Sequence, residues 1–158
     1  MGRATPVIDC AANAADLAAV RELFVEYAAG VGQPCCFEGF EGELDGLPGD
    51  YAAPHGGLLL ARDEGAPAGC VALRRLAPGT GEIKRLYVRP AYRGLKLGRR
   101  LAEAAIEAAR GTGCERVVLD TLPKMGEAIS LYRSLGFREI APYLARPTPG
   151  SLCFALSL

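Results

Sequence analysis

One segment decides the fold of this chain: VRPAYRGLKLGRRL, at residues 88–101. The apolar run before it, residues 83–88, stops close to Pro90, which cannot donate to a strand ladder and so marks the end of a strand. A basic, glycine-bearing loop follows, and apolar residues recur at helical spacing from Leu97 onward. A strand, such a loop and a helix together present backbone N–H groups and a helix dipole to an anion. We therefore expect an anion site here, and we expect the anion to be the pyrophosphate of a coenzyme.

The composition is that of one globular domain over residues 1–158, with half of the residues hydrophobic and 23% charged. The formal net charge is zero, so we expect neither nucleic acid nor a membrane among the partners. No apolar run approaches the ~18 residues of a membrane span, and no secretory signal is visible. Six cysteines without a CxxC pair and a single histidine predict no metal site and a reducing, cytoplasmic compartment. Adjacent Cys35 and Cys36 could form a redox-sensitive surface pair.

The charges are unevenly distributed. Residues 84–100 hold seven basic side chains and no acid, whereas residues 38–50 hold five acids and no base. A solvated face is the usual meaning of a charged run, and for the acidic segment this reading stands level with a functional one. Arg99 and Arg100 fall in a first helical turn, where the dipole disfavours cations unless a phosphate compensates. Lys84 and Arg85 are neighbours on a strand, so we expect them to point to opposite faces.

Periodicity and turn residues predict a strand and a helix, then a meander of three strands, then two further helices with strands between and after them. Residues 33–54 are rich in glycine, proline and acids, which is typical of a variable loop that covers a cleft. The strand at 82–88, the helix from 97 and the strand at 116–121 form a right-handed parallel crossover. The expected strands are 6–11, 57–62, 68–76, 82–88, 116–121, 138–140 and 152–156, and the expected helices are 13 to about 30, 42–47, 97–110 and 125–135.

Three motifs in this order resemble those of the GNAT superfamily of acyl-CoA N-acyltransferases. EIKRLYV at residues 82–88 resembles the family's fourth strand, and RGLKLG at 93–98 resembles its pyrophosphate loop. AISLYRSLGF at 128–137 resembles the end of a family helix. Each motif alone is a weak signal, but the three together at this spacing are a strong one. The resemblance extends over nearly the whole chain.

This resemblance implies an α/β (α+β) fold, the GNAT fold, with a mixed central sheet of about six to seven strands. An antiparallel meander comes first, a parallel β-α-β crossover lies at the cofactor site, and helices cover both faces. The resemblance also implies an acetyltransferase that uses acetyl-CoA and no metal, and dimerisation is common in the superfamily. The residues that it places at the cofactor are Leu86, Tyr87, Val88, Arg93, Gly94, Leu95, Lys96, Leu97, Gly98, Arg99, Met125, Ala128 and Tyr132.

Two residues depart from the family pattern. Lys96 stands where the loop usually has its middle glycine, and a left-handed backbone there is costly for lysine. Either Lys96 has ordinary dihedral angles, or its ammonium adds a phosphate contact. Met125 stands where many members have an asparagine that touches the cofactor, so that contact is lost or replaced by backbone.

Transfer of an acyl group from a thioester to an amine needs a base for the amine, an acid for the leaving thiolate and close positioning of the reactants. The resemblance places Tyr132 as the general acid, since a phenol with a pKa near 10 is protonated at neutral pH. Spacing alone favours a core residue at Tyr132, and it is the resemblance that favours a role at the cofactor. Glu82 is the candidate general base, directly or through water, and its alternative is a solvated carboxylate at a strand start.

The acceptor is the least determined part of this function. The resemblance implies a primary amine on a small molecule, a protein or a peptide, acetylated directly in a ternary complex. The acidic run at residues 38–50 favours a small, cationic acceptor through electrostatic steering. The alternative function is an acyl-CoA-binding sensor with the same fold and no turnover.

Overall fold

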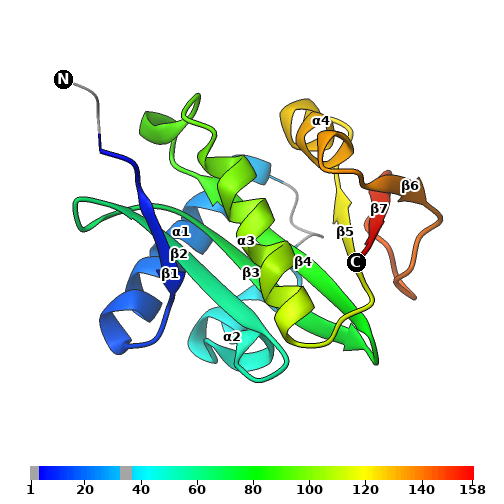
Figure 1. Cartoon of the computed structure of the whole chain (residues 1–158), viewed down its shortest axis with the longest axis horizontal. Helices are drawn as coiled ribbons and strands as arrows, with labels where there is room; N and C mark the ends of the chain where they lie inside the picture. Colours follow the sequence, from blue (N-terminus) through cyan, green and yellow to red (C-terminus); the bar gives the residue numbers. More distant parts are fainter. Residues whose placement is uncertain (1–3, 33–36) are drawn as a thin grey trace.

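The computed structural model describes residues 4–32 and 37–158. Seven strands form one mixed sheet in the order β1-β2-β3-β4-β5-β7-β6, with helices on both faces (Figure 1). The elements are β1 (Val7–Cys10), α1 (Ala14–Val31), α2 (Phe40–Asp45), η2 (Gly49–Tyr51), β2 (Gly57–Asp63), β3 (Ala66–Ala77), β4 (Thr80–Val88), η3 (Pro90–Tyr92), α3 (Leu97–Gly111), β5 (Arg116–Thr121), α4 (Gly126–Ser134), β6 (Arg138–Ile140) and β7 (Leu152–Ser157).

The predicted mixed sheet, meander and parallel crossover are confirmed. β1 to β4 pair antiparallel in sequence order, and β4 pairs with β5 in parallel. The predicted elements change mainly at their ends: β4 begins at Thr80 because its ladder with β5 starts there. The loop predicted over residues 33–54 contains α2 and η2 from residue 40 onward, whereas Cys35 and Cys36 lie outside the described residues.

Local sequence explains how α1 begins and ends. The Asp16 N–H donates to Asn13 Oδ1 at 2.9 Å, which caps the helix. At the other end Gly32 adopts a left-handed φ of 66°, which a glycine reaches without strain. These two caps define where α1 begins and ends, and its C-terminal end lies beside β4.

Alternate residues of the middle strands face two separate cores. Phe24 of α1 packs over Leu60 of β2 on one face. On the other face Leu101 of α3 packs against Leu73 of β3, and Tyr132 of α4 joins the same core. In Figure 1, α3 crosses the middle strands, while α4 lies with β5, β6 and β7 on the right of the view.

β4 and β5 separate after a short parallel ladder. They pair from Thr80↔Arg116 to Glu82↔Val118 and no further, although β5 continues to pair with β7 up to Thr121↔Leu152. Among the strands in the described part of the chain, none pairs with residues 83–88 of β4 on the side of β5. The backbone of this part of β4 is thus exposed along the gap.

A bulge in β4 lies beside this gap. Cys70 of β3 opposes Tyr87, but Ala72 opposes Lys84, so β4 contains one extra residue over this stretch. Arg85 has a left-handed φ of 59° at this point. The bulge bends the strand and changes the direction in which successive side chains point.

Four cysteines, Cys10, Cys70, Cys114 and Cys153, have free thiols. None of the helices in residues 4–32 and 37–158 combines the length and the apolar character that a membrane crossing needs.

Close contact between β3 and β4 gives a first stability prediction. A Cβ added at Gly69 would stand 2.6 Å from the carbonyl oxygen of Tyr87 and 3.1 Å from Leu101 Cδ1. Gly69→Ala should therefore lower the free energy of unfolding by roughly 1–3 kcal/mol, because backbone and core must both shift. Urea denaturation measures this change.

Gly42→Ala in α2 is the matched control, since nothing lies within 4 Å of its added Cβ. We expect that variant to be unchanged or slightly more stable, because alanine favours a helix. Equal stabilities of the two variants would contradict the close contact at Gly69.

Candidate active site

A groove of about 770 Å³ follows the gap beside β4. Its walls come from the end of α1, from β4, from the loop before α3 and from the start of α4. The lining residues are Tyr27, Gly30, Val31, Leu86, Tyr87, Val88, Tyr92, Arg93, Gly94, Lys96, Leu97, Gly98, Lys124, Met125, Gly126, Glu127, Ala128 and Leu131. Of the predicted cofactor residues, Leu95, Arg99 and Tyr132 are not among them.

The loop before α3 presents an uncapped helix N-terminus to the groove. Gly94 has a φ of 83°, and Lys96 occupies the N-cap position with φ 58° and ψ 21°. No side chain caps α3, so the N–H groups of its first turn have no capping partner and suit an anion. These dihedral angles of Lys96 are left-handed, so the alternative of ordinary dihedral angles is wrong. A left-handed backbone strains a lysine by about 1–2 kcal/mol.

The groove has the room and the charge that a diphosphate group needs. A Cβ added at Gly98 would lie 3.8 Å from Val88 Cγ2, so packing alone does not require glycine there. Because Gly98 has no Cβ, free space remains in the groove next to the N-terminus of α3. Arg93 and Lys96 of the loop before α3 and Lys124 of the segment before α4 line the groove and supply positive charge. Arg93 and Lys124 each also donate to a backbone carbonyl, that of Val88 and that of Val31. These residues fit a bound coenzyme pyrophosphate.

The predicted basic run does not form one phosphate-binding surface. Arg89 pairs with Glu22 and Glu26, each at 2.9 Å. Arg99 pairs with Glu103 at 3.0 Å, and Arg100 donates to the Pro6 carbonyl at 2.7 Å. The argument that a phosphate must compensate Arg99 and Arg100 is therefore wrong, since protein groups supply the acceptors. The cations of this run are close together in the sequence, but they do not all surround one ligand site.

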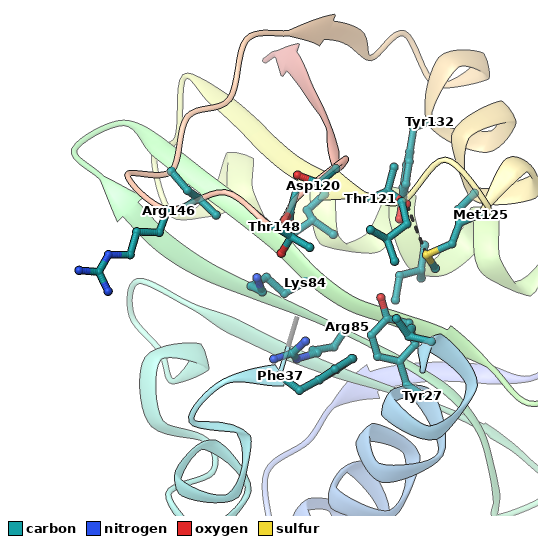
Figure 2. A pocket seen from close by; sticks show the side chains of 17 residues that line it. Tyr27, Phe37, Lys84, Arg85, Asp120, Thr121, Met125, Tyr132, Arg146 and Thr148 are labelled. Atoms are coloured by element: carbon teal, nitrogen blue, oxygen red, sulfur yellow. Dashed lines mark hydrogen bonds between the residues drawn. The ribbon is translucent and has the colours of Figure 1, made fainter. Parts of the chain in front are cut away.

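A smaller cavity of about 210 Å³ adjoins the groove, and the two share Tyr27, Val31, Leu86, Met125 and Ala128 (Figure 2). β4, β5, α4 and the segment between β6 and β7 enclose it. Its remaining lining residues are Phe37, Ile83, Lys84, Arg85, Asp120, Thr121, Leu122, Tyr132, Leu144, Arg146, Thr148 and Ser151.

Tyr132 is both a core residue and a cavity-lining residue, so its position is compatible with either role that the sequence left open. Its side chain is only 7% exposed and its ring lies 5.7 Å from that of Phe137, so it belongs to the core. It also lines the smaller cavity. Burial raises the pKa of its phenol well above 10, and the neighbouring Tyr27 and Asp120 raise it further. The phenol therefore keeps its proton throughout the neutral and mildly alkaline range.

Glu82 directly precedes the cavity-lining residues Ile83 and Lys84 in β4, and its side chain is fully buried. Arg74 Nε donates to Oε1 at 2.6 Å, and the Tyr143 hydroxyl donates to Oε2 at 2.5 Å. Burial and the adjacent Glu82 charge raise the pKa of Tyr143, which keeps this donor protonated. Glu82 is not among the lining residues, so the structure shows it as an anchor for the segment between β6 and β7. Its role as a base stays a prediction.

The expectation that Lys84 and Arg85 point to opposite faces is wrong. Both line the smaller cavity, because the left-handed residue at the bulge breaks the alternation of the strand. Arg85 donates to both carboxylate oxygens of Glu43, each at 3.0 Å, and its guanidinium lies over the rings of Phe37 and Phe40. Through these contacts of Arg85, the bulge in β4 holds α2 and Phe37 next to the cavity.

Asp120 is the functional candidate that the sequence reasoning missed. It is the only carboxylate among the cavity-lining residues that the structure describes. One signal was available: a polar residue stands next to the end of the apolar strand at residues 116–121. The spacing of residues in the sequence does not indicate that β4 and β5 separate beside Asp120.

Comparison with known proteins places this geometry in a family. The family model described as the acetyltransferase (GNAT) family matches residues 17–137. An uncharacterised N-acetyltransferase of Schizosaccharomyces pombe is 40% identical over 145 residues, which cover 90% of this chain and 89% of that protein.

Solved structures share the fold. An acetyltransferase from Streptococcus agalactiae superposes with a TM-score of 0.80 at 22% identity, covering 97% of this chain and 98% of the other. The acetyltransferase YncA from Salmonella typhimurium, solved with acetyl-CoA, gives a TM-score of 0.70 at 22% identity, with 98% and 94% covered.

The contacts of Glu82 predict the effect of one substitution. Tyr143→Phe removes a hydroxyl that donates to a buried carboxylate, so it should lower the free energy of unfolding by about 1–3 kcal/mol. Tyr87→Phe is the matched control, with an expected change within about 0.5 kcal/mol. Urea denaturation measures both variants, and a Tyr143→Phe variant as stable as its parent would refute the anchoring role of this contact.

Proposed function

Since the chain belongs to the GNAT family of acetyltransferases, we propose that it transfers the acetyl group of acetyl-CoA directly to a primary amine in a ternary complex. One observation carries the proposal: the groove with the uncapped α3 N-terminus adjoins a smaller cavity that Tyr132 lines. The groove suits the coenzyme, and the cavity suits the acceptor. Acetyl-CoA supplies the acetyl thioester between them.

Cofactor binding rests on main-chain groups and three cations. The first turn of α3 offers N–H donors to the pyrophosphate, Arg93 and Lys96 belong to the loop before it, and Lys124 lines the same groove from the segment before α4. Along residues 86–88 of β4, no described strand pairs with the edge on the side of β5, so backbone groups of this edge can offer hydrogen bonds to the amide-bearing arm of the coenzyme. The Val88 carbonyl already accepts from Arg93 Nε at 3.1 Å. Met125 lines both cavities, where the pantetheine arm and the acceptor would meet.

Transfer forms one C–N bond and breaks one C–S bond, and two protons move. The amine proton leaves to a base, and the departing sulfur takes a proton from the Tyr132 hydroxyl. Among the described lining residues, Asp120 is the carboxylate in position to accept the amine proton. Glu82 remains the candidate from the sequence, and its action requires a route through a neighbouring group because it is buried.

The acidic loop gives less support to a cationic acceptor than its sequence suggested. Of its carboxylates, Glu43 is bound by Arg85. Glu38, Glu41, Asp45 and Asp50 are exposed and do not line the cavity. Any attraction that they exert on a cation acts from outside the site.

Removal of the Tyr132 hydroxyl tests the acid role. Tyr132→Phe should lower kcat by about 10²–10⁴-fold, with an unchanged Kd for acetyl-CoA. The assay follows release of free thiol with a panel of amines, and calorimetry gives the Kd. Binding of acetyl-CoA by the parent protein with no thiol release on any amine would support the sensor instead.

The raised pKa of Tyr132 predicts the pH dependence. Burial favours the neutral phenol, so the general acid stays protonated past its ordinary pKa of 10. We expect kcat to show no decline from loss of this proton between about pH 8 and 10. A descending limb near pH 8 that disappears in Tyr132→Phe would contradict this expectation.

Two variants separate strain from charge at Lys96. Lys96→Gly relieves the left-handed backbone, so stability should rise by up to about 1 kcal/mol. Lys96→Gln keeps the strain and loses only the charge. If the ammonium binds pyrophosphate, both variants should bind acetyl-CoA roughly two- to fivefold more weakly. Unchanged affinity in both would exclude Lys96 as a phosphate ligand.

A further inference from the structure

Lys84 is a half-buried cation with little compensation. Its side chain is 18% exposed, and its ammonium lies 3.9 Å from Glu82 Oε2. Each oxygen of Glu82 already accepts a shorter hydrogen bond, one from Arg74 and one from Tyr143. Throughout residues 4–32 and 37–158, no acceptor forms a hydrogen bond with the Lys84 ammonium. A cation in this situation favours an anion that enters the cavity.

A buried hydroxyl among the lining residues is also without a hydrogen-bond partner in the described part of the chain. Ser151 Oγ is shielded from solvent and has no hydrogen-bond partner among the described residues, yet Ser151 lines the cavity. The Ser151 N–H donates to the Thr148 carbonyl at 3.0 Å, which holds both residues in one turn. A buried hydroxyl without a partner lowers stability unless a ligand satisfies it.

The charged residues that line the cavity are of both signs. Four charged residues line it: Lys84, Arg85 and Arg146 against Asp120. Glu43 neutralises Arg85 within the protein. Figure 2 shows Lys84, Asp120 and Thr148 on one side of the cavity, whereas Arg146 extends away from the other labelled side chains. Inside the cavity, one cation and one carboxylate therefore face the acceptor.

On the basis of the proposed acetyl transfer, we propose that the acceptor is an amino acid-like molecule, whose carboxylate is bound by Lys84 and Ser151 while its amine faces Asp120. A zwitterion of this kind matches both charges, whereas a diamine would bring no anion to Lys84 and would add a second cation. A singly charged carboxylate suits one ammonium and one hydroxyl. The cavity of about 210 Å³ is smaller than the 300–1,000 Å³ of drug-sized pockets, so it suits a small acceptor.

Pairs of acceptors that differ only in the carboxylate test the proposal. L-amino acids are compared with their primary amides and with cationic diamines, with thiol release as the assay. The amine of an amide is less basic and more often neutral at pH 7, so a preference for the free acid cannot come from amine reactivity. We expect kcat/KM to be at least about tenfold higher for the preferred amino acid than for its amide.

Substitutions at Lys84 test whether this residue causes the preference for the free amino acid over its amide. Lys84→Met should raise KM for the amino acid about tenfold and abolish its advantage over the amide, with the Kd for acetyl-CoA unchanged. Lys84→Arg should restore part of the preference. Arg110→Gln is the matched control, because Arg110 is an exposed cation of α3, paired with Glu107, that lines neither cavity. It should behave like the parent protein.

Calorimetry with coenzyme A present separates this proposal from the proposed transfer. Amino acid binding that depends on Lys84, without turnover, would support the carboxylate site and overturn the transfer. Turnover of amides or diamines as fast as of amino acids would overturn the carboxylate site and support the transfer. Absence of both binding and turnover over the whole amino acid panel would overturn both.

Discussion

Three parallel residue pairs between β4 and β5 hold the two halves of the sheet together, and the site exists because the ladder stops there. A longer ladder would satisfy the backbone of β4 and close the gap. Instead, β5 stays paired with β7 beyond the point where it separates from β4, and the edge of β4 between residues 83 and 88 has no partner strand on that side in the described part of the chain. Both cavities lie along that edge. The donor and acceptor regions thus result from one interruption of regular pairing.

The bulge at Arg85 adds the second constraint. Regular alternation would place Lys84 and Arg85 on opposite faces, and one of them would leave the cavity. The left-handed residue brings both to the same side. One of these cations is then neutralised by Glu43 and attaches α2, whereas the other keeps its charge for the cavity. A single irregular residue therefore separates a structural cation from one available to a ligand.

Buried polar contacts keep the walls of the acceptor cavity in place. Glu82 connects Arg74 of β3 with Tyr143 of the segment before β7, through hydrogen bonds of 2.6 Å and 2.5 Å. In the low-dielectric interior such charge-assisted bonds are strong, and loss of one partner leaves a costly buried charge. The wall that contains Thr148 and Ser151 is thus tied to the strand that carries Lys84. Binding groups on distant segments are held in one arrangement.

The sequence alone determined the elements and the anion loop, because both follow from local periods and turn residues. The spacing of apolar residues fixed the strands and helices, and residues 88–101 located the helix N-terminus that faces the groove. The tertiary structure decided which charges are available. Arg89 and Arg100 found partners in the N-terminal part of the chain, Glu82 became buried, and Asp120 came to line the cavity. These outcomes depend on pairing between segments far apart in the chain, and no local pattern encodes where a ladder stops or which acid reaches which base.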